Sequence, residues 1–153
     1  MSTVTNPHTG TQHLTIDEML AHARRALQRM YAFEAPAAIA RGAILVDIRP
    51  QAQRAREGVL PGALAIERNV LEWRLDPSSS ARISSAVDHD VEWVVVCSEG
   101  YTSSLAAYAL QQLGLHRATD LVGGYQALRA AGLVNIGVAT AHFRREANSL
   151  ISV

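Results

Sequence analysis

Short apolar runs that alternate with helical patterns restrict the fold of this chain more than any other feature. Residues 91–96 form the strongest strand candidate, a similar apolar run lies at 43–46, and residues 119–122 are a further short strand candidate. Continuous apolar runs of this length are typical of strands buried on both faces of a parallel sheet. Because each run is followed by a helical pattern, we predict an α/β fold with a mostly parallel sheet and helices on both faces.

The rest of the chain completes this alternation. Thr15 and Glu18 form a capping-box pattern that predicts an N-terminal helix over residues 14–29. Further expected elements are short strands at 30–33 and 63–66 and helices at 36–41, 51–57, 67–75, 82–87, 103–113 and 125–131. The expected organisation is a mobile tail at 1–13, the helix at 14–29, a core domain at 30–132, and an extension at 133–153 with a helical pattern at 141–147.

The composition excludes several classes of function. The net charge of zero gives no reason to expect a nucleic-acid or membrane partner, and all 14 basic residues are arginine, which excludes lysine Schiff-base chemistry. The single cysteine cannot form an internal disulfide, and the sequence has neither a secretory signal pattern nor an apolar run of membrane-spanning length. We expect a cytoplasmic protein that needs no metal and no cofactor.

The single cysteine lies where a nucleophile is expected. Cys97 follows the strand candidate at 91–96, and a helical pattern begins at Ser103. Gly100 can adopt a positive φ and let the loop wrap around the sulfur, so that backbone N–H groups and the helix dipole favour a thiolate. We expect Thr102 or Ser103 to cap the helix. A lone cysteine is more often a small buried side chain at a strand end, but the glycine-containing loop favours the nucleophile here.

Two charged residues end another strand candidate. Asp47 and Arg49 follow the run at 43–46, and sites in parallel α/β sheets lie beyond the carboxyl ends of the strands. Arg49 could orient an anionic substrate or form a structural ion pair with Asp47, and the pattern leaves both roles open. The complete set of candidate site residues is Asp47, Arg49, Cys97, Ser98, Glu99, Gly100, Tyr101, Thr102 and Ser103.

Four segments together resemble the single-domain rhodanese-like proteins. They are residues 45–49 (LVDIR), 57–63 (EGVLPGA), 95–103 (VVCSEGYTS) and 121–128 (LVGGYQAL), and they occur in the order and spacing of that family. The resemblance covers about residues 30 to 132 of the chain. It implies a five-stranded parallel sheet with the strand order 1-5-4-2-3, flanked by helices.

The same resemblance implies a sulfurtransferase. Cys97 would take the outer sulfur of thiosulfate or of a persulfide donor, become a persulfide, and pass the sulfur to cyanide or to a thiol. A sulfur-relay protein is a further candidate partner, and the segments 1–29 and 133–153 could support a homodimer. Glu99 would disfavour thiosulfate as the donor, because a carboxylate beside the pocket repels a dianion.

The fold leaves two rival functions. Cys-dependent phosphatases of a related fold need an arginine six residues after the cysteine to bind phosphate. That position is Ser103, which makes phosphatase activity the weaker alternative. The other rival is a non-catalytic binding or regulatory module, and the presence of Cys97 favours catalysis over it.

Overall fold

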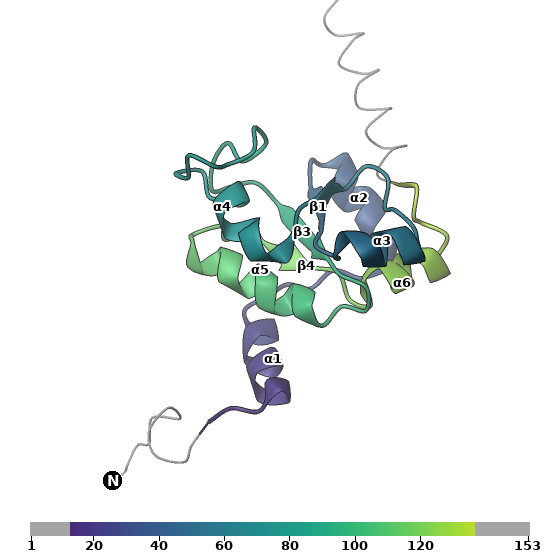
Figure 1. The fold of residues 1–153 in the computed structure, drawn as a ribbon, viewed down its shortest axis with the longest axis horizontal. Helices are drawn as coiled ribbons and strands as arrows, with labels where there is room; N and C mark the ends of the chain where they lie inside the picture. The colour runs from purple at the N-terminus through teal and green to yellow at the C-terminus, as the bar shows by residue number, and fades with distance from the viewer. Residues whose placement is uncertain (1–12, 137–153) are drawn as a thin grey trace, which may run out of the picture.

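Helices surround a parallel sheet in the computed structural model, which describes residues 13–136 (Figure 1). The helices are α1 (Ile16–Arg25), α2 (Ala35–Ala40), α3 (Gln51–Glu57), α4 (Leu71–Leu75), α5 (Thr102–Gln112) and α6 (Gly124–Ala130), with 3-10 helices η1 (Ala32–Glu34) and η2 (Arg68–Val70). The strands are β1 (Ile44–Asp47), β2 (Leu64–Ala65), β3 (Trp93–Val96) and β4 (Thr119–Asp120). The predicted α/β class is confirmed. The expected tail up to residue 12 and the helical pattern at 141–147 lie outside the described residues.

The described part of the sheet has four parallel strands in the order β2-β1-β3-β4. The fifth strand that the sequence predicts at 30–33 is reduced to Met30, which forms a single parallel bridge with Leu121. The next N–H, from Tyr31, donates to the Glu34 carboxylate at 2.8 Å, and the chain turns into η1 instead of extending. The five-stranded sheet and its order 1-5-4-2-3 are therefore not confirmed.

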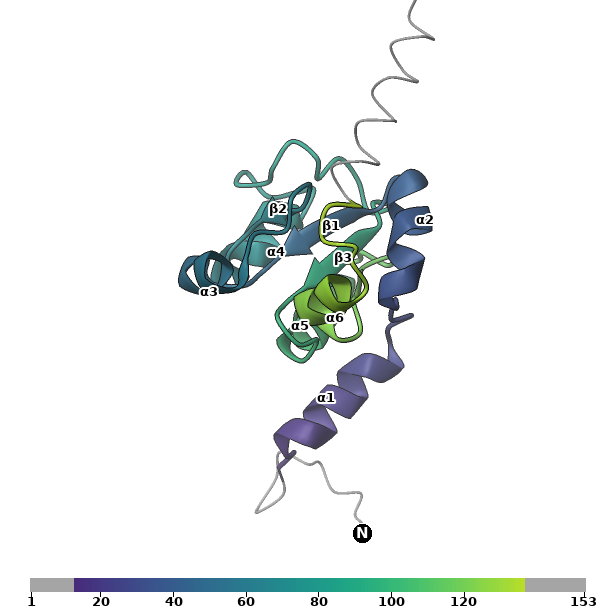
Figure 2. The ribbon, with the colours of Figure 1, turned by 90° about the vertical axis from the view of Figure 1, so that its right-hand side faces the viewer.

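Side chains of the central strand alternate between two apolar cores. Trp93 and Val95 pack with α4 and α5 on one face, and Val94 and Val96 pack with α2 and α6 on the other. All four side chains are 0% exposed. Figure 2 shows α2 and α4 on opposite sides of the sheet. The helices on both faces explain why this strand is a continuous apolar run.

The N-terminal helix begins with the predicted capping box. The Glu18 N–H donates to Thr15 Oγ1 at 3.1 Å, and the Thr15 N–H donates to Glu18 Oε1 at 2.8 Å. Helix α1 ends at Arg25 rather than near residue 29, and it packs against α5 (Figure 1). This contact places the end of α1 close to the loop that follows β3.

The helix predicted at 82–87 is wrong, because turns occupy this segment. The Ala81 N–H donates to Ser79 Oγ at 3.0 Å, and the Ile83 N–H donates to the Arg74 carbonyl at 2.9 Å. The second hydrogen bond ties Ile83 back to α4, and turns rather than a helix occupy the residues that follow.

Candidate active site

The loop after β3 lies where the carboxyl ends of three strands meet. Cys97 directly follows Val96, the last residue of β3, and α5 begins at Thr102. Asp47 at the end of β1 pairs with Val96, and Asp120 at the end of β4 pairs with Val95. Parallel pairing therefore brings Cys97, Asp47 and Asp120 to one edge of the sheet. The thiol itself is buried, with Cys97 5% exposed.

One backbone N–H of the loop already points at the sulfur. The Gly100 N–H donates to Cys97 Sγ at an N···S distance of 3.2 Å. Gly100 has the predicted positive φ of +87°. A Cβ at this position would also come within 2.6 Å of the Gly123 nitrogen. Only glycine allows this conformation and this close approach, and both hold the donor against the thiol.

The turn between β4 and α6 supports the loop from the other side. The Tyr125 N–H donates to the Cys97 carbonyl at 2.8 Å, and the Gln126 N–H donates to the Ser98 carbonyl at 3.0 Å. These N–H groups lie at the start of α6, where helical N–H groups lack partners within the helix. A Cβ on Gly124 would lie 2.4 Å from the Cys97 carbonyl oxygen. The paired glycines of the LVGGYQAL segment therefore let the two backbones touch.

Glu57, at the end of α3, binds the loop through Ser98. Ser98 Oγ lies 3.0 Å from both carboxylate oxygens of Glu57, and Gln126 Nε2 donates to the same hydroxyl at 3.2 Å. Burial raises the pKa of Glu57, but hydrogen bonds from Ser98, Gln53 and Arg49 outweigh it and lower the pKa. The ionised carboxylate therefore stabilises the fold at neutral pH, and this contribution is lost as the pH falls through the lowered pKa.

Arg49 is buried and ion-paired. Its guanidinium donates to both oxygens of Asp47 at 3.0 and 2.8 Å, to Glu57 at 3.2 Å and to the Gly58 carbonyl at 2.9 Å. It also lies 3.9 Å from the centre of the Tyr125 ring, and its side chain is 0% exposed. Burial opposes the charge, but the hydrogen bonds and charges of Asp47 and Glu57 outweigh it and raise the pKa of Arg49. Of the two roles that the sequence leaves open, these contacts support the ion pair.

A second polar group lies behind the loop, around Asp120. This carboxylate is 0% exposed and accepts hydrogen bonds from Ser103 Oγ at 2.7 Å and from Ser104 Oγ at 2.8 Å. Arg29 donates to its two oxygens at 2.8 and 3.1 Å. Arg29 also donates to the Gly100 carbonyl at 3.0 Å. Asp120 is thus joined to the loop both through Arg29 and through the first turn of α5.

The remaining predicted residues lie at the surface of the loop. Glu99, Tyr101 and Thr102 are exposed. The expectation that Thr102 or Ser103 caps α5 is wrong, because Tyr101 is the N-cap residue and makes no side-chain capping bond. The Ser103 hydroxyl binds Asp120 instead.

Sequence reasoning missed Asp120, Arg24, Arg29 and the role of Glu57. An acidic residue inside a short strand candidate, at 119–122, is a signal that could have pointed to Asp120. No local signal identifies Arg24 or Arg29, because their acceptor Gly100 lies 76 and 71 residues further along the chain.

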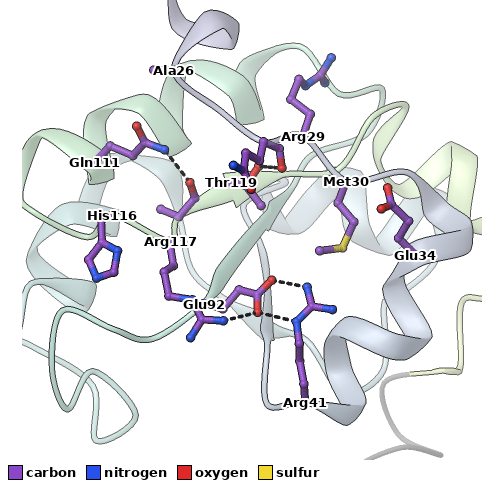
Figure 3. Close-up of a pocket in the computed structure, with 12 residues that line it drawn as sticks. Ala26, Arg29, Met30, Glu34, Arg41, Glu92, Gln111, His116, Arg117 and Thr119 are labelled. Carbon is purple, nitrogen blue, oxygen red and sulfur yellow. Dashed lines mark hydrogen bonds and ion pairs between the residues drawn. The ribbon is translucent and has the colours of Figure 1, made fainter.

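A pocket lies beside the amino ends of β3 and β4. It has a volume of about 560 Å³, and Figure 3 shows Glu92 between Arg41 and Arg117 on its wall. Glu92 precedes β3, whereas Cys97 follows it. None of the lining residues belongs to the loop at 97–101. The loop site is therefore described by its hydrogen bonds and by the thiol.

Across 13–136, no three His, Cys, Asp or Glu side chains are grouped in a way that could hold a metal ion. In the same range, no helix combines the length and apolar character needed to cross a membrane.

Residues 32–131 match the Rhodanese-like domain family. This range is more than half of the chain, and the chain therefore belongs to the rhodanese-like domain family. No curated protein matches the chain.

Solved structures include relatives of the same fold. A protein of unknown function from Rhodopseudomonas palustris, described as a possible tyrosine phosphatase, is 31% identical with a TM-score of 0.70, covering 84% of this chain and 97% of its own. The human single-domain sulfurtransferase is 23% identical with a TM-score of 0.56, covering 67% of this chain and 95% of its own. A rhodanese-related protein from Thermoplasma volcanium is 22% identical with a TM-score of 0.52, covering 68% and 92%. At these identities, the last two support the fold alone.

Proposed function

We propose that this protein is a rhodanese-type sulfurtransferase that works through a persulfide on Cys97. The observation that carries the proposal is the Gly100 N–H directed at Cys97 Sγ, in a loop at the carboxyl edge of the sheet. A donor at 3.2 Å from Sγ favours the negatively charged thiolate, which is the form that attacks a sulfur donor. A cysteine with only a packing role does not need such a donor.

The reaction has two steps that conserve charge and sulfur. The Cys97 thiolate attacks the outer sulfur of thiosulfate, the S–S bond of thiosulfate breaks, and sulfite leaves with the bonding electron pair. The product is a Cys97 persulfide anion. A nucleophilic acceptor such as cyanide then attacks the terminal sulfur, and the enzyme thiolate leaves as thiocyanate forms. Because the chain has one cysteine, an external acceptor must complete the cycle.

Phosphatase activity is the alternative suggested by the name of the R. palustris relative. Such enzymes bind phosphate with a charged arginine, which donates two parallel hydrogen bonds. The equivalent position here holds Ser103, which is 0% exposed and donates its hydroxyl hydrogen to Asp120. An uncharged side chain turned away from the loop supports sulfur transfer over phosphate hydrolysis.

The function is tested by incubating the protein with thiosulfate, weighing the intact chain, and then adding cyanide. We expect a gain of one sulfur atom that disappears as thiocyanate is released. Absence of the added sulfur with thiosulfate and with a small-molecule persulfide would contradict the proposal. Release of phosphate from p-nitrophenyl phosphate, but no thiocyanate, would favour the phosphatase instead.

The charge of Glu99 is expected to limit the use of thiosulfate. Glu99 is exposed on the loop next to Gly100, and its carboxylate repels a dianion that approaches Cys97. We expect Glu99→Lys to raise kcat/KM for thiosulfate roughly fivefold at low ionic strength, with a smaller gain in high salt. The measurement is the rate of thiocyanate formation at several salt concentrations.

Glu99→Gln is the matched control for that substitution. It removes the negative charge without adding a positive one, so its kcat/KM should lie between those of the wild type and Glu99→Lys. An unchanged or lower kcat/KM in Glu99→Lys would mean that this charge does not act on the approaching donor.

A further inference from the structure

Two arginines from outside the matched family range reach the back of the active-site loop. Arg24 lies in α1, and Arg29 lies between α1 and η1. Both precede residue 32, where the match to the rhodanese-like domain begins. We call Arg24, Arg29 and Asp120 the loop anchor.

The two arginines of the loop anchor donate to one carbonyl group. Arg24 Nη2 donates to the Gly100 carbonyl oxygen at 2.8 Å, and Arg29 Nη2 donates to the same oxygen at 3.0 Å. Asp120 holds the Arg29 guanidinium from behind, and Ser104 Oγ accepts from Arg24 Nε at 3.0 Å. Two charged donors on one oxygen, each with its own support, hold this carbonyl in a single direction.

The direction of this carbonyl determines the direction of the next N–H. The peptide bond between Gly100 and Tyr101 is trans, since residues 13–136 contain no cis peptide. In a planar trans peptide the carbonyl and the N–H point in opposite directions. The Tyr101 N–H therefore points away from the arginines. The other peptide of Gly100 carries the N–H that donates to Cys97 Sγ.

The loop anchor also carries a net positive charge. Arg29 is paired with Asp120, whereas no ion pair within residues 13–136 includes Arg24. On the other side of the loop, the Glu57 carboxylate accepts from Ser98 and disfavours a second negative charge nearby. The charge of Arg24 opposes that effect. Its guanidinium is half-buried, beside the Tyr101 ring at 5.6 Å, where solvent screens it less than at the surface.

We propose that Arg24 and Arg29 are positioning residues for sulfur transfer. By holding the Gly100 carbonyl they fix the loop in the conformation in which the Gly100 N–H donates to Cys97 Sγ, and the charge of Arg24 favours the anionic sulfur. The proposal rests on the proposed function for its role in catalysis. The effect of the two arginines on the Cys97 thiol can be measured without any sulfur transfer. The helix α1 is then part of the active site and not only a packing element of the fold.

The test compares Arg24→Gln, Arg24→Lys and Arg29→Gln with a control, Arg25→Gln. Arg25 neighbours Arg24 in α1, is exposed, and contacts His22 rather than the loop. For each variant, the rate of Cys97 alkylation by uncharged iodoacetamide is measured as a function of pH, and urea unfolding is measured alongside. Since Cys97 is the single thiol, the rate reports on it alone.

We expect Arg24→Gln and Arg29→Gln to slow alkylation at pH 7 by about five- to tenfold and to move the pH profile to higher pH. Arg24→Lys should recover part of the rate because it restores the charge, and Arg25→Gln should match the wild type. Arg24→Gln leaves Asp120 paired with Arg29, so this variant keeps the test valid if Arg29→Gln does not fold. An alkylation profile of Arg24→Gln equal to that of the wild type would overturn the proposal.

The outcomes separate this inference from the proposed function. Slower alkylation in Arg24→Gln, in a protein that forms no persulfide, would uphold the positioning of the thiol and contradict sulfur transfer. Persulfide formation with unchanged alkylation would uphold sulfur transfer and overturn the role of the loop anchor.

Discussion

Cys97→Ser is expected to abolish sulfur transfer while leaving the fold intact. A serine hydroxyl has nearly the same shape as the thiol, but it is not ionised near neutral pH and forms no stable bond to the transferred sulfur. Thiocyanate formation from thiosulfate and cyanide should fall by about a thousandfold or more, because the covalent intermediate can no longer form. The measurements are the rate of thiocyanate release and the intact mass after exposure to thiosulfate.

The single cysteine makes this prediction easy to interpret. Since no other thiol exists in the chain, any added sulfur in the wild type must be on Cys97 or bound without a covalent bond, and unfolding before weighing separates the two. Ser98→Ala is a control on the neighbouring residue. This variant removes the hydrogen bond from Ser98 to Glu57 but retains the Cys97 thiol. Thiocyanate release by Cys97→Ser at the wild-type rate would show that the nucleophile lies elsewhere.

Arg49→Met is expected to cause the largest loss of stability among single substitutions at this site. It keeps most of the side-chain length but leaves the Asp47 carboxylate, 2% exposed, without its guanidinium partner. Breaking a buried ion pair by removing one partner costs about 3–5 kcal/mol, because an uncompensated charge stays buried. The free energy of unfolding in urea measures this loss.

Arg41→Met is the matched control. Arg41 also forms a two-point ion pair, with Glu92, but its side chain is 51% exposed and Arg117 contacts the same carboxylate. An exposed pair of this kind contributes at most about 1 kcal/mol. If Arg49→Met instead kept its stability and raised KM for thiosulfate, Arg49 would be a donor-binding residue and not a structural one.

Local patterns predicted the main secondary-structure elements. The run at 91–96 and the capping box at Thr15 predicted β3 and the start of α1, because both depend on residues a few positions apart. The strand at 30–33 and the helix at 82–87 were wrong. At 30–33 the Tyr31 N–H donates to the Glu34 carboxylate instead of a neighbouring strand, and at 82–87 the Ile83 N–H donates back to the Arg74 carbonyl of α4.

The part of the site that depends on local sequence pattern was predicted, and the rest was not. The positions of Cys97 and Gly100 between a strand and a helix follow from local pattern, and the positive φ of Gly100 was expected. The roles of the charged residues were not, because an arginine gives no local indication of which acceptor it will meet. Arg49 could bind substrate or Asp47, and only packing on Tyr125 and burial beside Glu57 settle which contacts it makes.

By itself, the sequence determined the α/β alternation, the family, and the place of the single thiol at the end of a buried strand. These depend on periodicity and on motifs that span few residues. Only the tertiary structure decided what surrounds that thiol. The parallel pairing of β3 with β4 and the packing of α1 on α5 bring Asp120 and Arg24 to the back of the loop. Hydrogen bonds between residues so distant along the chain exist only after the sheet and its helices have packed.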